Sequence, residues 1–285
     1  MKDRKVLRKE LDTLYERYDS REYVDPDPLA FLYRYDLPAD REIAGFIASS
    51  LAFGGVAQIM ASVEAALGPM GDSPYGFLMG NDTKEFSGIF RGFRHRWASG
   101  EDLSGALAGL KRVINEYGSL ENCFLEGYSE DDEDILPGLS FLVSRIGGGA
   151  VCGGNNCLLP APAKGSACKR LNLLLRWMVR EDGVDPGGWT AVPASKLLIP
   201  LDVHMHRFAG LLGFTNRKQG DIRTAREVTA GFRKINPDDP VKYDFSITRL
   251  GIRRDGDRDR LMAKLGLGGR PETSARSKGK GGRSN

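Results

Sequence analysis

The chain has 285 residues, of which 41% are hydrophobic and 28% are charged, and its net charge is +3. This length supports one large domain or two small ones with a substantial core, and the charge balance excludes a uniformly basic nucleic-acid coat. The first 18 residues are charged throughout and contain no apolar segment of a secretory signal, so we expect a cytoplasmic protein with reduced thiols.

The spacing of apolar residues and the helix end signals predict an almost wholly helical chain. The first helix is expected over residues 3–18, where leucines and tyrosines form one stripe at helical spacing. Pro38 starts the next helix with Asp40 as its cap, and the apolar stretch 43–67 follows with a break at Gly54 and Gly55. The uncharged segment 43–63 is interpreted as a buried core helix and not as a membrane span, because it contains glycine, glutamine and serine.

The second half of the chain carries further helix signals. Ser166 and Asp202 are candidate caps, and Pro240 is a candidate first-turn residue. Helices are expected over 101–117 ending at Gly118, about 132–146, 167–181, 203–212 ending at Gly213, 222–235, and from Pro240 to Gly251. The predicted fold class is therefore all-α, with a single domain over 1–252 made of two helical subdomains. One subdomain is expected as a helical barrel over about 40–145, entered by the N-terminal helix, and the segment after about 160 supplies the other.

Two segments lack helix signals. Residues 147–165 are rich in glycine, proline and alanine, which predicts a long loop, and residues 253–285 are expected to form a basic, largely disordered tail. The spacing of Cys152, Cys157 and Cys168 does not match the close ligand pairs of a structural zinc site. We therefore expect neither a metal nor a cofactor.

Lys169 and Asp202 are the most informative pair of residues. Lys169 follows a segment rich in glycine and proline, and Asp202 follows the segment LLIPL and opens a predicted helix. A lysine amine can attack an electrophilic carbon, and a nearby carboxylate can take its proton and stabilise positive charge. Two simpler interpretations remain open at this point: Lys169 as an ordinary surface lysine, and Asp202 as a helix cap only.

Three motifs resemble the helix–hairpin–helix DNA glycosylases that carry a Gly/Pro-rich loop and an aspartate. Leu159-Pro160 with Gly165-Ser166-Ala167-Cys168-Lys169 resembles the family's hairpin, although residues 161–164 (APAK) stand where the family has a tight glycine turn. The segment 200–207 (PLDVHMHR) resembles the aspartate motif, and residues 240–251 resemble the closing helix. The resemblance spans about residues 40–252. It is nearest to the archaeal 8-oxoguanine glycosylase branch and to an uncharacterised prokaryotic family grouped with these enzymes.

The resemblance implies a DNA-repair glycosylase with abasic-site lyase activity, bound to double-stranded DNA in a cleft between the two subdomains. Lys169 would attack the sugar C1′, expel a damaged base such as an oxidised purine, and form a Schiff base; Asp202 would accept the proton. A nucleoid-associated location in the cytoplasm follows from such a substrate. The residues expected to contact DNA are Gly165, Ser166, Arg170, His204, Arg207, Arg94 and Arg96, and those expected at the base pocket are Gln58 and Trp177.

Several alternatives stay open. The arginines and aromatics of residues 91–97 suit a base-stacking surface, or equally a solvated helix end. Trp177 suits the core as well as a pocket, and His204 and His206 lie two positions apart, which argues against a shared metal site on a helix. At the level of function, the alternatives are a catalytically silent DNA-structure-binding protein on the same fold, or a nucleobase or nucleoside enzyme that uses the same lysine and aspartate.

Overall fold

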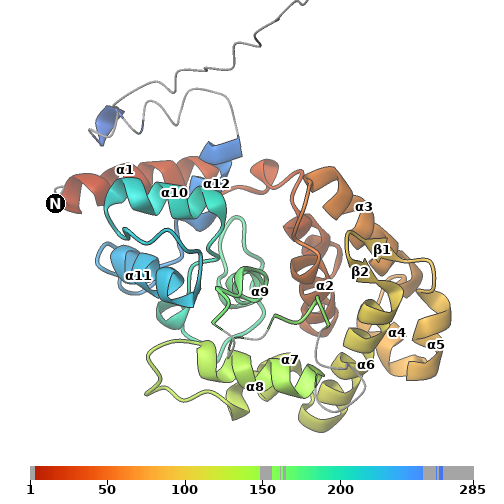
Figure 1. Ribbon diagram of the computed structural model, residues 1–285. Coiled ribbons are helices and arrows are strands. Elements are labelled where there is room, and N and C mark those ends of the chain that lie inside the picture. Colours follow the sequence, from red (N-terminus) through yellow and green to blue (C-terminus); the bar gives the residue numbers. More distant parts are fainter. Residues whose placement is uncertain are drawn as a thin grey trace, which may run out of the picture.

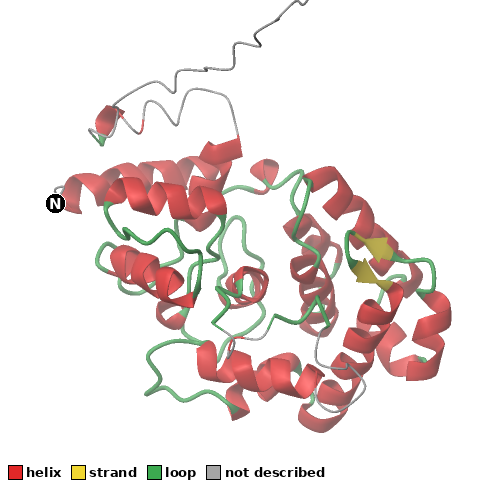
Figure 2. Ribbon diagram, in the orientation of Figure 1, coloured by secondary structure: helices red, strands yellow, loops and turns green. Residues whose placement is uncertain are grey.

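The computed structural model describes residues 4–147, 156–160, 162, 165–252, 261 and 263–265. Its regular structure is almost wholly helical, which confirms the all-α prediction (Figure 2). The first six helices are α1 (Arg4–Tyr18), α2 (Pro38–Ser50), α3 (Val56–Leu67), α4 (Pro74–Gly80), α5 (Thr83–Ile89) and α6 (Gly100–Tyr117). They are followed by α7 (Leu120–Glu126), α8 (Leu136–Gly147), α9 (Lys169–Val179), α10 (Val203–Leu212), α11 (Ile222–Arg233) and α12 (Asp244–Ile252).

Helix α9 lies at the centre of the molecule (Figure 1). Helix α2 packs along α9, while α7 and α8 pack against each other and against α6. Helices α1 and α10 both pack against α12, on the other side of α9 from α3 to α6. The N-terminal helix α1 lies on α12, and its apolar stripe of Leu7, Leu11 and Leu14 is buried.

Several predicted helix ends are confirmed. The chain breaks between α2 and α3 around Gly54, whose φ of 108° suits glycine. Asp202 caps α10, and Gly213 ends that helix in the left-handed conformation with φ 74°. Among the described residues, no helix is long and apolar enough to cross a membrane, and the uncharged stretch 43–63 is divided between α2 and α3.

Three residues predicted to begin helices have other roles, although α2 does begin at Pro38 as predicted. Asp40 does not cap α2, whose N-cap is Leu37; its carboxylate instead accepts hydrogen bonds from Ser73 Oγ and Tyr75 N at the start of α4. Ser166 accepts from Cys168 N and so stabilises the turn before α9, whose N-cap is Cys168. Pro240 lies in a turn, because the last helix begins only at Asp244.

Residues 94–99 form a two-stranded antiparallel hairpin, β1 (Arg94–His95) and β2 (Ala98–Ser99), where a helix end was the simpler alternative. The short helices α4, α5 and α7 were also not predicted. The described residues do not include Cys152 or most of the predicted loop 147–165. Of the predicted tail 253–285, they include only Leu261 and residues 263–265.

A buried network of ion pairs holds the centre of the fold together. Arg176 lies in the last turn of α9, and Arg180 is the C-cap of that helix one turn later. The carboxylate of Asp185 forms an ion pair with both. Asp244 on α12 pairs with Arg176 at 2.6 Å, and Asp239 pairs with Arg180 at 2.8 Å. Buried charges must be compensated, so the network ties α9 to the loop that follows it and to α12.

We expect Asp185→Ala to lower the free energy of unfolding by about 3–5 kcal/mol, because it removes the carboxylate shared by two buried guanidinium groups. Chemical denaturation measures the change. Glu64→Ala is the control, since its ion pair with Arg34 has half-exposed side chains and should contribute less than about 1 kcal/mol. Equal losses in the two variants would contradict the proposed importance of the network.

Candidate active site

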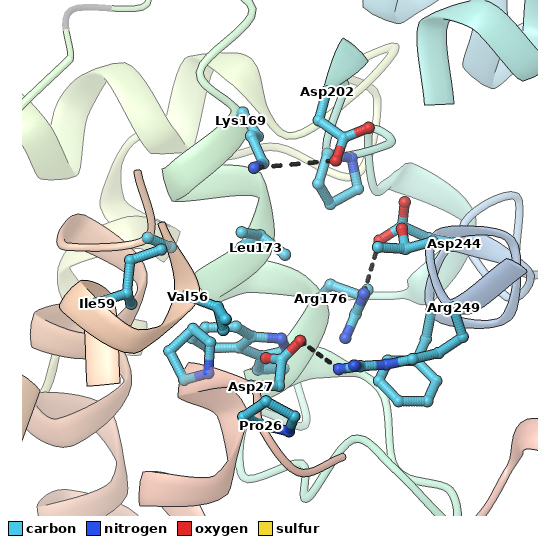
Figure 3. Close-up of a pocket in the computed structure, with 16 residues that line it drawn as sticks. Pro26, Asp27, Val56, Ile59, Lys169, Leu173, Arg176, Asp202, Asp244 and Arg249 are labelled. Atoms are coloured by element: carbon cyan, nitrogen blue, oxygen red, sulfur yellow. Dashed lines mark hydrogen bonds and ion pairs between the residues drawn. The ribbon is translucent and has the colours of Figure 1, made fainter. Parts of the chain in front are cut away.

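Lys169 and Asp202, which are far apart in the sequence, meet in the structure. Lys169 is the first residue of α9, Asp202 is the N-cap of α10, and Lys169 Nζ lies 4.0 Å from Asp202 Oδ2 (Figure 3). The side chains are 37% and 19% exposed, so solvent reaches the amine. At this distance the contact is an ion pair and not a hydrogen bond, and such contacts in enzymes often shorten when substrate binds.

The two carboxylate oxygens of Asp202 have different partners. Oδ1 accepts the backbone N–H of Met205 at 2.7 Å and caps α10, while Oδ2 faces Lys169. The capping interpretation is therefore correct but incomplete. Because the cap fixes the rotamer of the side chain, Oδ2 is held toward the amine by the start of the helix itself.

A cavity of about 170 Å³ opens beneath this pair. In Figure 3, Lys169 and Asp202 lie at one end, and Val56 and Ile59 lie along one side. An apolar cavity of about 150 Å³ is large enough to bind benzene, so this cavity has room for a planar ring system. Trp177, predicted at a base pocket, lines the cavity and is only 1% exposed.

The wall opposite Val56 and Ile59 is charged. Arg176 pairs with Asp244 at 2.6 Å, and Arg249 pairs with Asp27 at 2.7 Å at the end of the cavity away from Lys169 (Figure 3). Burial and the negative charge of Asp202, opposed by the positive charge of Arg176, together raise the pKa of Asp244 to about 6. Carboxylates accept hydrogen bonds and guanidinium groups donate them, so this side of the cavity offers polar groups of both kinds to the edge of a bound ring.

A larger, open groove of about 770 Å³ adjoins the same pair. Lys169, Arg170, His206 and Lys218 supply positive or protonatable groups, and the turn at Ser166–Cys168 lies along it. Lys169 and Asp202 line both the groove and the smaller cavity. The pair thus lies where a large open groove meets a smaller and less open cavity.

Arg170 stabilises the wall of the groove. Its guanidinium donates to the carbonyls of Ser50 at 2.7 Å and Cys157 at 2.6 Å, and it lies over the ring of Phe53. Burial lowers the pKa of this arginine. These contacts join the end of α2 to the start of α9, beside Lys169.

The other predicted site residues are more dispersed. His204 and Arg207 lie exposed on α10, and Gly165 has a φ of 79° in the turn before α9; within the described chain, none of the three lines either cavity. Gln58 is exposed in the first turn of α3, beside Gly54, and does not line the smaller cavity. Arg94 and Arg96 are exposed on the β1–β2 hairpin.

Four charged residues of the cavity were not predicted: Asp27, Arg176, Asp244 and Arg249. The sequence could have predicted Arg176 at the site, because Lys169 lies seven positions before it and residues seven apart lie on the same face of a helix. The others come from distant segments, and their sequence context does not distinguish them from surface charges. His206, whose Nε2 contacts the carbonyl of Arg217, and Lys218 were likewise missed in the groove.

The cysteines do not form a reactive or metal-binding cluster in the described residues. Cys123, Cys157 and Cys168 are free thiols, and no group of three or more His, Cys, Asp or Glu side chains gathers there. Burial raises the pKa of Cys168 to about 11, which disfavours the thiolate that metal binding or nucleophilic attack requires.

Substitutions of Asp202 separate its two roles. Asparagine caps helices about as well as aspartate, so we expect Asp202→Asn to keep the free energy of unfolding within about 0.5 kcal/mol of the wild type. Asp202→Ala should lose about 1 kcal/mol because the cap is removed. Urea denaturation of both variants tests this, and an equally destabilised asparagine variant would show that the charge and not the cap supports α10.

Residues 27–253 match the sequence model of a family described as "Protein of unknown function (DUF2400)". Neither the curated proteins nor the solved structures that were compared with the chain gave a match. The matched span contains both Lys169 and Asp202, and it covers more than half of the sequence. The chain therefore belongs to the DUF2400 family.

Proposed function

We propose that the protein is a base-excision DNA glycosylase with abasic-site lyase activity, and that Lys169 and Asp202 carry the reaction. The observation that supports this most strongly is the place of the pair, 4.0 Å apart, at the junction of a ring-sized cavity and an open groove. A glycosylase needs this combination, because the target base must leave the duplex and enter a pocket while the backbone stays outside.

The chemistry follows from the two side chains. Lys169 transfers a proton to Asp202, and its neutral amine attacks the sugar C1′. The glycosidic C–N bond breaks, the base leaves with the bonding electrons and takes the proton back from Asp202, and the regenerated carboxylate stabilises the positive charge that develops on the sugar. The C1′–O4′ bond then breaks as the nitrogen loses a proton and O4′ gains one, which gives a Schiff base. Removal of a C2′ proton drives β-elimination, which breaks the C3′–O bond and releases the 3′ side of the strand.

The surroundings of the pair favour DNA over a free nucleoside. The groove is several times larger than the cavity, and Lys218 and His206 line it, which suits a phosphate backbone. The charged wall with Arg176 and Asp244 suits the hydrogen-bonding edge of a damaged base. An oxidised purine is the first lesion to test, since its ring carries both donors and acceptors.

Borohydride trapping tests the covalent step. With duplex DNA that carries an abasic site or an oxidised purine, we expect a covalent adduct in the wild type and none in Lys169→Ala, because the amine that forms the imine is absent. Lys218→Ala is the matched control: it removes a lysine from the same groove and should lower DNA affinity but keep the adduct. An adduct that survives in Lys169→Ala would refute the role of Lys169, and no adduct in the wild type would refute the lyase.

Filling the cavity should separate base excision from strand cleavage. Val56 lines the cavity and is 45% exposed, so the fold should tolerate Val56→Trp while the indole occupies space that a base needs. We expect this variant to lose base excision by more than about tenfold and to keep trapping at a preformed abasic site, which has no base to accommodate. Unchanged excision in assays with a lesion-containing duplex would exclude this cavity as the base pocket.

A further inference from the structure

The β1–β2 hairpin is mounted rigidly on the rest of the protein. His95, which is fully buried, contacts Ser62 Oγ through Nδ1 at 2.8 Å and the carbonyl of Phe53 through Nε2 at 2.9 Å. Its ring also packs edge-on against the ring of Phe53 at 4.5 Å. The hairpin is thus fixed both to α3 and to the segment that leaves α2.

The tip of this hairpin presents an exposed tryptophan. Trp97 is 60% exposed although its ring stacks on Phe53, with centroids 4.9 Å apart. The guanidinium of Arg170 lies over Phe53 at 4.9 Å, and that of Arg96 lies over Trp97 at 4.8 Å. An indole is costly to leave in water, so a ring supported in this way is preorganised for a partner.

The charge around Trp97 is positive. Arg91, Arg94 and Arg96 are exposed, and none has a carboxylate partner among the residues that the structure describes. Phe53, on which Trp97 stacks, also lines the open groove together with Lys169 and Asp202. The hairpin therefore lies at the rim of the groove that adjoins the candidate active site.

We propose that the hairpin is a second DNA-contact site, in which Trp97 stacks on a base next to the nucleotide held at Lys169 while Arg94 and Arg96 bind the flanking phosphates. The inference rests on the proposed DNA substrate and adds a stacking site to it. Aromatic rings combined with unpaired cations are the usual means of holding unstacked bases and their backbone. When a base replaces the guanidinium of Arg96 on the ring of Trp97, the Arg96 side chain can turn to bind a phosphate.

The other classes of partner fit less well. A lipid surface would need a broader apolar face than one indole among arginines, and a protein interface would need a larger apolar patch. A nucleic acid matches both features at once, since its bases stack and its phosphates neutralise the arginines.

Tryptophan fluorescence can test the contact directly. The chain has three tryptophans, and Trp177 and Trp189 are 1% and 3% exposed, so a change caused by a ligand at the surface reports mainly on Trp97. The probe is a duplex with a stable abasic-site analogue. We expect it to quench the emission of the wild type, and we expect Trp97→Ala to bind it about tenfold more weakly, as for loss of one stacked base. Trp97→Phe should regain most of this affinity because it restores a ring.

Leu37→Ala is the matched control, because it removes another exposed apolar side chain (65% exposed) at the opposite end of α2. Its affinity should equal that of the wild type. Tight DNA binding without quenching, with equal affinity in Trp97→Ala, would overturn the proposal. Quenching by heparin to the same extent as by DNA would also overturn it. So would quenching by anionic phospholipid vesicles in place of DNA, or failure of the wild type to bind the duplex.

Borohydride trapping distinguishes failure of this inference from failure of the proposed reaction. If the wild type and Trp97→Ala form the Lys169 adduct equally well at limiting protein concentration, the hairpin proposal fails while the lyase stands. If the duplex quenches Trp97 and the Trp97→Ala variant binds weakly, but no adduct forms, the hairpin proposal stands while the lyase fails.

Discussion

The position of α9 depends on the compensation of two buried positive charges. Arg176 and Arg180 cannot remain in the interior without carboxylate partners, and these come from Asp185 in the following loop, from Asp239 and from Asp244 on α12. Because these partners belong to different segments, the network fixes α9 against both the loop and α12. Lys169 lies two helical turns before Arg176 on the same helix, so the network also fixes the backbone position from which its side chain extends.

The candidate site uses groups that already support the fold. Asp202 caps α10 with one oxygen and faces Lys169 with the other, while Asp244 stabilises Arg176 and also lines the cavity. A site of this kind lies on rigid helices, which favours the precise placement that catalysis needs. Substitutions at Asp244 should therefore change both the free energy of unfolding and the binding of a ligand in the cavity. Substitutions at Lys169 and Val56 should change the free energy of unfolding less.

The sequence predicted the fold class and the longer helices because apolar periodicity and local caps are encoded over short distances. It missed α4, α5 and α7, since helices of about two turns carry little periodicity. It also misassigned three residues at helix starts, because the side chains of Asp40 and Ser166 can cap a helix but accept other hydrogen bonds, and because the turn at Pro240 delays the last helix. At the candidate site, local motifs identified Lys169 and Asp202, while Asp27 and Arg249 had no local signal.

By itself, the sequence determined that the chain is helical, that Asp202 opens a helix, and that a lysine and an aspartate stand in segments suited to shared chemistry. Only the tertiary structure decided that the two side chains meet at 4.0 Å, that a cavity lies beneath them, and that Trp97 stands at the rim of their groove. The physical reason is the separation in sequence over which each interaction acts. Helix caps and apolar periodicity involve residues a few positions apart, whereas the contacts of α9 with α2 and α12 join segments far apart in the chain.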